Sequence, residues 1–228
     1  MCGRFASTTP PDKLAAYFGA EAPQLEDDES IDPDYNVAPT RDVPTVRIRN
    51  DDRKLDYLRW GLVPRWAKDL RIGSKMINAR AETVATKNSF RSAFKKRRCL
   101  VVADGFYEWK RLDSKTKQPM YIHRADGDPL AFAGLFERWT DGEQHREIHT
   151  CTIITTTPNQ TMSPIHDRMP VLLAPNRWEE WLDPDNDDTD SLQQLLVPAP
   201  DELLDTYAVA DLVNNVRNNE PSLLTPVQ

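Results

Sequence analysis

Short strand-like segments follow one another between residues 99 and 155, and this succession restricts the possible folds more than any other feature. The run Cys99–Ala103 is entirely apolar, which is typical of a strand buried on both faces. Further segments of strand character lie at 106–110, 120–123, 130–135 and 149–155. The connectors are rich in Asp, Ser and Gly, and such short turns join antiparallel neighbours. We therefore expect one domain dominated by antiparallel strands, with helices at its periphery.

The flanking regions predict a hairpin and several short helices. Residues 45–49 and 55–60 alternate apolar and polar side chains around Asn50-Asp51-Asp52, the pattern of a β-hairpin. Thr9 should cap a helix that has prolines in its first turn and Leu14 and Phe18 on its apolar face. Further helices are expected at 88–97, 175–182 and 191–196, a strand at 169–173, and acidic surface segments at 20–34 and 183–190.

Composition argues against a membrane or secreted protein. No stretch approaches the roughly 18 apolar residues of a membrane span, and no apolar run follows Met1-Cys2-Gly3-Arg4-Phe5 to mark a secretory signal. The 3 cysteines are too few and too scattered for a disulfide framework. No linker divides the 228 residues, so we expect a single domain over 1–228 in a soluble, cytoplasmic protein with reduced cysteines and no membrane partner.

Charge is distributed unevenly along the chain. The net charge of −7 by itself argues against binding nucleic-acid phosphates. Residues 41–124, however, hold 22 of the 29 Lys and Arg and only 9 of the 36 Asp and Glu, a local net charge of +13. This asymmetry indicates either a basic face for nucleic acid or acidic and basic segments that pair across the fold.

Aromatic and basic residues interleave at 59–68, within the basic region. A tryptophan beside Arg and Lys in a loop suits stacking on an unpaired base combined with phosphate contact. This interpretation applies to Trp66, whereas Trp60 lies in a predicted strand and is expected in the core.

Cys2 has the most informative position in the chain. Cysteine is small enough for the initiator Met1 to be removed, which would leave a thiol and a primary amine on adjacent carbons. Such an aminothiol attacks an aldehyde as an amine and then closes a thiazolidine ring through sulfur. Alternatively, the thiol cleaves an amide bond with its own amine as the base, or Cys2 is an inert residue at a frayed chain end.

Glu108 and His166 are candidate proton-transfer groups. Strand alternation places Glu108 on the same face as Phe106, where poor solvation would raise the pKa of the carboxyl and suit it to acid–base catalysis. The alternative is an edge-strand glutamate that faces water. His166 lies in a loop beside Asp167 and Arg168, the usual setting of a proton shuttle, although most single histidines are structural.

Metal and nucleotide chemistry find little support. Only His145 and His149 have a ligand-like spacing, and the β-branched residues after His149 favour a strand over the helix that this spacing needs. The 8 glycines are not clustered into a phosphate-binding loop. We therefore expect neither a metal nor a cofactor.

Characteristic segments occur along nearly the whole chain. They are MCGRF at 1–5, YNVAPT at 35–40, WGLVPRW at 60–66, NARAET at 78–83, CLVVADGFYEWK at 99–110, AFAGLFERW at 131–139, TTTPN at 155–159, IHDRMPV at 165–171 and VNNVRNN at 213–219. In this order they resemble the SRAP family, the SOS response-associated peptidases or abasic-site-processing proteins. The sequence departs from the family at Ala67, where some relatives carry a second Trp, and in its Asp-rich C-terminal third.

The resemblance implies an α+β domain whose curved, mainly antiparallel β-sheets form a barrel-like core, with peripheral helices and a positively charged groove for single-stranded DNA. The family's catalytic residues correspond to Cys2, Asn78, Glu108 and His166. Its DNA-contacting residues correspond to Arg4, Trp66, Arg80 and Arg168, and Pro39 and Trp109 should lie beside the site.

The implied function is capture of abasic sites in single-stranded DNA and at single-strand/double-strand junctions of replication forks. Cys2 would form a thiazolidine crosslink, while His166 moves a proton at the sugar ring oxygen, Glu108 moves protons at the amine and imine, and Asn78 holds the amine. An imine left unclosed would permit weak AP-lyase activity. The alternatives are an N-terminal-nucleophile cysteine peptidase or amidohydrolase, and a non-covalent reader of modified single-stranded DNA. We expect a monomer, cytoplasmic and associated with the nucleoid during DNA damage.

Overall fold

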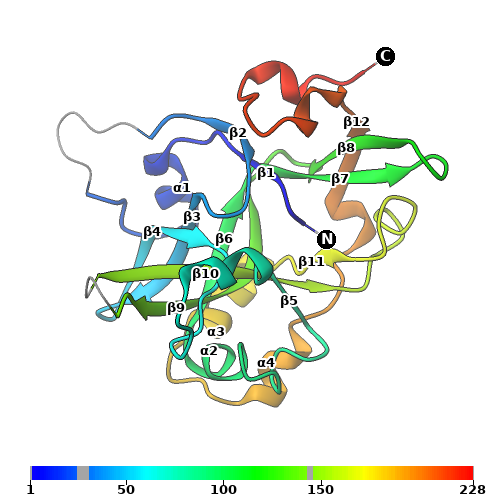
Figure 1. The fold of residues 1–228 in the computed structure, drawn as a ribbon. Coiled ribbons are helices and arrows are strands. Elements are labelled where there is room, and N and C mark those ends of the chain that lie inside the picture. The colour runs from blue at the N-terminus through cyan, green and yellow to red at the C-terminus, as the bar shows by residue number, and fades with distance from the viewer. Residues whose placement is uncertain (1, 25–30, 143–145, 228) are drawn as a thin grey trace.

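Two β-sheets and a set of short helices make up the fold of this computed structural model, which describes residues 2–24, 31–142 and 146–227 (Figure 1). One sheet has five strands in the order β12–β8–β7–β1–β2, and all of its pairings are antiparallel. Its strands are β1 Phe5–Ser7, β2 Asp34–Val37, β7 Gly105–Arg111, β8 Lys117–Arg124 and β12 Leu204–Ala208.

The second sheet closes on itself as a barrel. Its path runs β11–β10–β4–β3–β6–β9, and β5 pairs with β10 off this path. A further pairing of β10 with β9 closes the ring β10–β4–β3–β6–β9. The strands are β3 Asp42–Arg49, β4 Asp52–Trp60, β5 Asn78–Arg80, β6 Arg98–Ala103, β9 Leu130–Thr140, β10 Glu147–Thr156 and β11 Met169–Pro170. The expected α+β fold with a barrel-like core is confirmed, although β10 pairs in parallel with β4 and β5.

Strand β6 shows why the chain needs a fully apolar run. Cys99 and Val101 face the barrel interior, where they pack in one core cluster. Leu100 and Val102 point to the opposite face and belong to a second cluster, which includes residues of the helices. Because both faces of β6 are covered, alternation of polar and apolar residues is absent from this strand.

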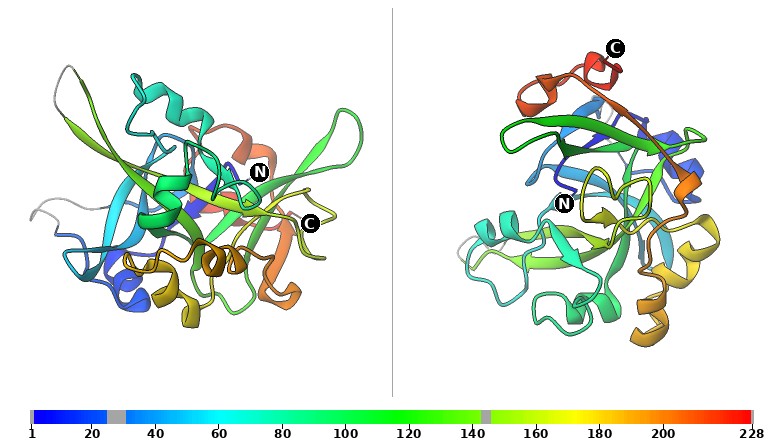
Figure 2. Two further views of the ribbon diagram at one scale, coloured as in Figure 1. Left: turned by 90° about the horizontal axis from the view of Figure 1, so that it is seen from below. Right: turned by 90° about the vertical axis from the view of Figure 1, so that its right-hand side faces the viewer.

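Short helices cover the outside of the barrel. They are α1 Pro11–Phe18, α2 Arg91–Lys96, α3 Trp178–Leu182 and α4 Thr189–Gln194. Figure 1 shows α2, α3 and α4 grouped below the barrel. Figure 2 shows the C-terminal segment on the side of the five-stranded sheet that faces away from the barrel. The 3-10 helices are η1 Leu70–Lys75, η2 Pro175–Arg177, η3 Asp201–Leu203, η4 Asp211–Asn214 and η5 Pro221–Leu224. Within the described ranges, no helix is long and apolar enough to cross a membrane.

The predicted β3–β4 hairpin is confirmed. The two strands pair from Asp42 opposite Arg59 to Arg49 opposite Asp52. Asn50 has a φ of 53° and Asp51 a φ of 66°. Left-handed conformations at two successive residues are what a tight two-residue hairpin turn requires, and Asn and Asp tolerate them better than most residues.

The expected Thr9 cap is wrong. The N-cap of α1 is Pro10, and it makes no side-chain capping bond. The Thr9 hydroxyl instead donates to Asp104 Oδ1 at 2.5 Å, a residue 95 positions further along the chain. A tertiary partner has therefore displaced the local cap that the sequence pattern predicted.

Other predicted elements are shorter or shifted. The helix predicted at 88–97 begins only at Arg91, because residues 81–90 form turns. The strand predicted at 169–173 comprises Met169–Pro170 and a single bridge from Leu172 to Phe132. Helix α4 begins within the predicted acidic loop, because the Asp188 carboxylate accepts bonds from the backbone N–H groups of its first turn.

Strands β1, β2, β5 and β12 were not among the predicted elements. Each is short, and its neighbours in the sheet are distant in sequence, so periodicity alone could not reveal it. Part of the predicted acidic segment 20–34 and His145 lie outside the described residues.

Candidate functional site

Cys2 and the strand that follows it lie where the five-stranded sheet packs against the barrel. Strand β1 pairs with β7 and β2, with Phe5 opposite Phe106 and Val37. The Phe5 and Trp60 rings lie 5.0 Å apart between centroids. This packing holds Cys2 fully buried in the same core cluster, so Cys2 is not a frayed chain end. Trp60 is fully buried, as expected for a core residue.

Asn78 contacts Cys2 directly. Asn78 is the first residue of β5 and lies opposite Ile153 in the parallel pairing with β10. Its Nδ2 donates to the carbonyl oxygen of Cys2 at 2.8 Å. Its Oδ1 is buried and accepts no hydrogen bond from the described part of the chain. An amide oxygen in this position can accept a bond from a donor on Cys2.

Glu108 is a buried carboxyl group rather than an edge-strand residue facing water. Its exposed fraction is 3%, and burial raises the pKa of its carboxyl, while the charge of His166 opposes this rise. His166 Nε2 lies 3.9 Å from Glu108 Oε2. His166 Nδ1 accepts the backbone N–H of Arg168 at 3.0 Å, which directs Nε2 toward Glu108. Two groups able to move protons therefore meet at the site.

The buried position of Cys2 affects the protonation of its thiol. Burial raises the pKa of the thiol, and the negative charge of Glu108 raises it further. The thiol is therefore protonated near neutral pH, and it needs a neighbouring base before sulfur can act as a nucleophile. Glu108 is the neighbouring carboxylate that can take this proton.

Arg4 and Trp109, both predicted to serve DNA, contact each other. The Arg4 guanidinium carbon lies 5.9 Å from the centroid of the Trp109 ring. Arg4 Nη1 also donates to Asn36 Oδ1 at 2.7 Å and to the Val213 carbonyl at 2.9 Å. These bonds hold Arg4 beside Cys2 and leave its side chain half-buried.

Arg168 is engaged by a carboxylate that the sequence analysis did not single out. Its Nη1 and Nη2 donate to the two carboxylate oxygens of Glu82 at 2.5 and 3.0 Å. These bonds lower the pKa of Glu82. Glu82 lies within the NARAET segment, yet only the fold brings it to Arg168, 86 positions away. A phosphate that binds Arg168 therefore competes with Glu82 or shares the guanidinium with it.

The remaining predicted DNA-contacting residues lie outside this cluster. Arg80 ends β5 and is exposed, and Trp66 is 62% exposed in the segment between β4 and β5. Pro39 lines a separate cavity with Asn36 and Val216. The structure thus joins Cys2, Asn78, Glu108 and His166 closely, and the proposed DNA contacts surround them more loosely.

Asn36 is a second residue that the sequence analysis missed. It is buried, accepts from Arg4, and donates to the carbonyl groups of Val213, Asn215 and Asn218. The YNVAPT and VNNVRNN segments contain these residues, but their pairing across at least 177 positions is a tertiary contact. Asn36 therefore anchors the C-terminal segment to the residue that flanks the site.

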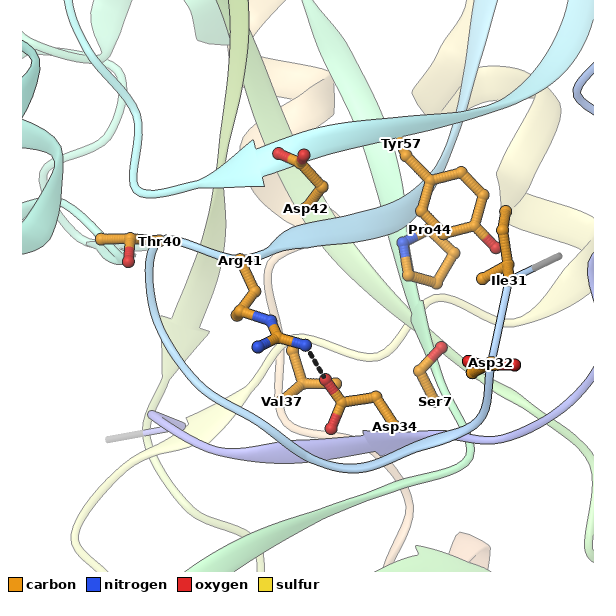
Figure 3. Close-up of a pocket in the computed structure, with 10 residues that line it drawn as sticks. All are labelled: Ser7, Ile31, Asp32, Asp34, Val37, Thr40, Arg41, Asp42, Pro44 and Tyr57. Carbon is orange, nitrogen blue, oxygen red and sulfur yellow. Dashed lines mark hydrogen bonds and ion pairs between the residues drawn. The ribbon is translucent and has the colours of Figure 1, made fainter. Parts of the chain in front are cut away.

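A cavity of about 620 Å³ opens beside β2, β3 and β4, and it is separate from the Cys2 cluster (Figure 3). Arg41 pairs there with Asp34 at 3.3 Å, and Asp32 and Asp42 add further acidic groups. An acidic lining repels phosphate, so this cavity does not suit DNA. Among the described residues, no group of three or more His, Cys, Asp or Glu is arranged to hold a metal ion.

The structure is thus an α+β protein in which a near-terminal cysteine, with an amide, a carboxyl and an imidazole around it, lies where a closed barrel meets a second sheet. The family model described as SOS response associated peptidase (SRAP) matches residues 1–216, and the chain belongs to this family. The resemblance inferred from the sequence segments is confirmed.

Individual relatives match along the whole chain. The chain is 47% identical over 224 residues to abasic site processing protein YoqW of Bacillus subtilis, a match that covers 98% of this chain and 99% of that protein. It is 35% identical over 235 residues to abasic site processing protein YedK of Escherichia coli, with 100% of both chains covered. A crystal structure of a protein from Bacteroides thetaiotaomicron matches with a TM-score of 0.89 at 29% identity, covering 100% of both chains.

Proposed function

We propose that this protein processes abasic sites by capturing them covalently in single-stranded DNA. Removal of Met1 would expose the Cys2 amine beside its thiol, and the two groups together would bind the aldehyde carbon C1′ of the opened deoxyribose. The observation that carries the proposal is the cluster of Cys2, Asn78, Glu108 and His166. Relatives named abasic site processing proteins give further support.

The first steps form an imine. His166 moves a proton at the ring oxygen, which opens the cyclic hemiacetal and exposes the C1′ aldehyde. The Cys2 amine, held by the Asn78 amide oxygen, attacks C1′ to give a carbinolamine. Protonation of the departing hydroxyl by Glu108 releases water and leaves the protonated imine. The raised pKa of Glu108 suits it to give and regain protons near neutrality.

Ring closure completes the crosslink. Glu108, now a carboxylate, takes the thiol proton of Cys2 as sulfur adds to C1′, and the nitrogen keeps the proton that it already carries. The product is a thiazolidine between Cys2 and the sugar, with one water released overall and no strand break. A site in which closure fails would hold the imine longer, and β-elimination from it would give weak AP-lyase activity.

A peptidase that uses the same thiol receives less support. Amide cleavage would need a peptide substrate, whereas relatives that match nearly the whole chain are named abasic site processing proteins. A non-covalent reader of modified DNA would have no use for the buried cluster. We therefore propose covalent capture in preference to the peptidase and the non-covalent reader.

Cys2→Ala tests the proposed function. We expect the variant to lose the stable crosslink to abasic single-stranded DNA while its DNA affinity stays within a few-fold, because Cys2 is buried and exposed groups would contact the strand. Intact-mass analysis detects the adduct, and fluorescence anisotropy gives the affinity. Cys2→Ser serves as the matched control and should form at most a labile adduct, since an oxazolidine reverts more readily.

Undiminished, heat-stable crosslinking by Cys2→Ala would contradict the thiazolidine assignment. Cleavage of peptides by the wild-type protein without a DNA adduct would favour the peptidase. DNA binding with neither reaction would favour the reader.

A further inference from the structure

A second polar cavity lies beside the barrel, away from the Cys2 cluster, and has a volume of about 560 Å³. Its basic side chains, called the arginine mouth below, are Arg47, Arg49, Arg65, Arg97, Arg138 and His149. His149 precedes Ile153, the partner of Asn78, by four residues along β10. At a rise of about 3.3 Å per residue, the arginine mouth begins roughly 13 Å from the site along this strand.

The arginine mouth carries more positive charge than its own carboxylates neutralise. Each carboxylate is shared by two basic groups: Asp56 by Arg47 and Arg49, Glu137 by Arg65 and Arg97, and Glu147 by Arg138 and His149. Five arginines therefore face three carboxylates, which leaves an excess of two positive charges when His149 is neutral. An anion bound here would meet a net attraction.

Hydrogen-bond donors also remain available. An arginine offers five N–H donors in a planar fork, and each carboxylate contact uses only some of them. Arg97 Nε is buried and makes no hydrogen bond within the described part of the chain. The side chains of Arg49 and Arg138 are 57% and 54% exposed at the cavity rim. Phosphate, with several acceptor oxygens, is the anion that such forks bind best.

The arginine mouth adjoins the proposed DNA path. Arg65, half-exposed at the rim, directly precedes the exposed Trp66 in the chain. A strand that stacks a base on Trp66 therefore brings its backbone to Arg65. We infer that the arginine mouth binds a backbone phosphate of the same single strand whose abasic site reaches Cys2. This inference rests on the proposed function and adds a second anchoring point for the strand.

The test compares two charge-matched double variants of the full chain. Arg49→Gln/Arg138→Gln removes the two rim guanidiniums, whose contacts to Asp56 and Glu147 are long at 3.6 and 3.9 Å. Arg111→Gln/Lys115→Gln removes the same charge from the exposed end of β7 and the turn that follows it. Affinity is measured by anisotropy over a salt series, with undamaged oligonucleotides of about 4 and about 16 nucleotides, the range of single-strand site sizes.

For the longer oligonucleotide we expect Arg49→Gln/Arg138→Gln to bind about tenfold more weakly than the wild type. The slope of log affinity against log salt should become shallower by about 0.7 for each phosphate that the variant no longer binds. The shorter oligonucleotide, once placed at Cys2 and Trp66, should be affected much less, and the turn variant should match the wild type. Equal weakening in the two double variants, or equal weakening for both lengths, would overturn the inference.

Inorganic phosphate distinguishes the two sources of the ligand. If phosphate alone raises the melting temperature of the wild type but not of Arg49→Gln/Arg138→Gln, while the length dependence is absent, the arginine mouth takes a free phosphate and the assignment to the DNA strand is wrong. The binding measurements use undamaged DNA and do not depend on crosslinking. Failure of the proposed crosslinking reaction would instead appear as a missing adduct in the intact-mass analysis of the wild-type protein with abasic DNA.

Discussion

At the scale of single residues, the site places ionisable groups where solvation is poor. Burial raises the pKa of both the Cys2 thiol and the Glu108 carboxyl, and each negative charge would disfavour the other. A charged Glu108 therefore lowers the stability of the folded protein near neutral pH. This arrangement suits a reaction in which the Cys2 thiol and the Glu108 carboxyl give and take protons.

Glu108→Gln should raise stability near neutral pH and abolish efficient crosslinking. The folded protein holds the Glu108 proton more tightly than the unfolded chain, whose glutamate pKa is about 4.3. Stability therefore falls as pH rises from this value through the folded pKa, and a neutral amide avoids the loss. Urea midpoints at about pH 4 and near pH 7 should show a gain only at the higher pH.

Glu82→Gln is the control with the opposite sign. The Arg168 hydrogen bonds lower the pKa of Glu82, so its contribution to stability is present at neutral pH and is lost as pH falls through the lowered pKa. This variant should be less stable than the wild type near pH 7. A stability gain for Glu82→Gln, or none for Glu108→Gln, would contradict these pKa directions.

Arg80→Ala and Arg168→Ala should weaken single-stranded DNA binding. If each removes one phosphate contact, the slope of log affinity against log salt becomes shallower by about 0.7. Anisotropy titrations over a salt series measure this slope, with Arg111→Ala as a charge-matched control at the exposed end of β7. An unchanged slope would place Arg80 or Arg168 outside the DNA path.

At the scale of elements, the segment between β4 and β5 depends on two glycines in close contact. Gly61 has a φ of +122°, and a Cβ there would lie 2.6 Å from the Gly73 carbonyl oxygen. The backbone N–H of Gly61 also bonds to the Cys151 carbonyl at 2.8 Å. The close approach of Gly61 and Gly73 holds together the two ends of the segment that presents Arg65 and Trp66.

Gly61→Ala should destabilise the protein by about 1–3 kcal/mol and weaken DNA binding. Alanine adds strain at the positive φ and forces Gly73 away, which displaces Trp66. Gly127→Ala provides the matched control, because Gly127 has a φ of +81° with open space around it. If both variants are destabilised equally and keep their DNA affinity, the contact with Gly73 has no role.

At the scale of elements, local sequence patterns correctly predicted several strands and helices. The β3–β4 hairpin, strand β6 and helix α1 follow from alternation, a continuous apolar run and proline placement. The Thr9 cap was wrong because Asp104 competes for the same hydroxyl. Strand β5 was not predicted, because its three residues form a strand only by pairing with β10.

At the scale of the whole molecule, the charge asymmetry has two outcomes. Some basic groups pair with acidic groups from distant segments: Lys95 lies 3.2 Å from Asp187, and Arg97 lies 2.8 Å from the buried Glu137. Other arginines, such as Arg80, are exposed. The pairing interpretation is therefore confirmed for these groups, and a basic face for nucleic acid stays a prediction.

Abasic sites in single strands or at junctions should react much faster than those in continuous duplex. The Cys2 cluster is enclosed, so a stacked duplex must extrude the sugar at a cost of a few kcal/mol. Stacking on Trp66 returns about 1–3 kcal/mol per base, but only for a base already unpaired. Crosslinking rates on matched oligonucleotides measure the preference, and equal rates on all three would show that the protein flips its target.

The sequence by itself determined the family, the mainly antiparallel α+β fold and the four residues of the Cys2 cluster. They follow from short motifs in family order and from local periodicity, both of which are visible along the chain without knowledge of distant contacts. The tertiary structure alone decided which strands close the barrel, the pairing of Arg168 with Glu82, the Asn36 anchor and the arginine mouth. Each depends on contacts between segments far apart in the chain, and no local pattern encodes which distant partner a side chain will meet.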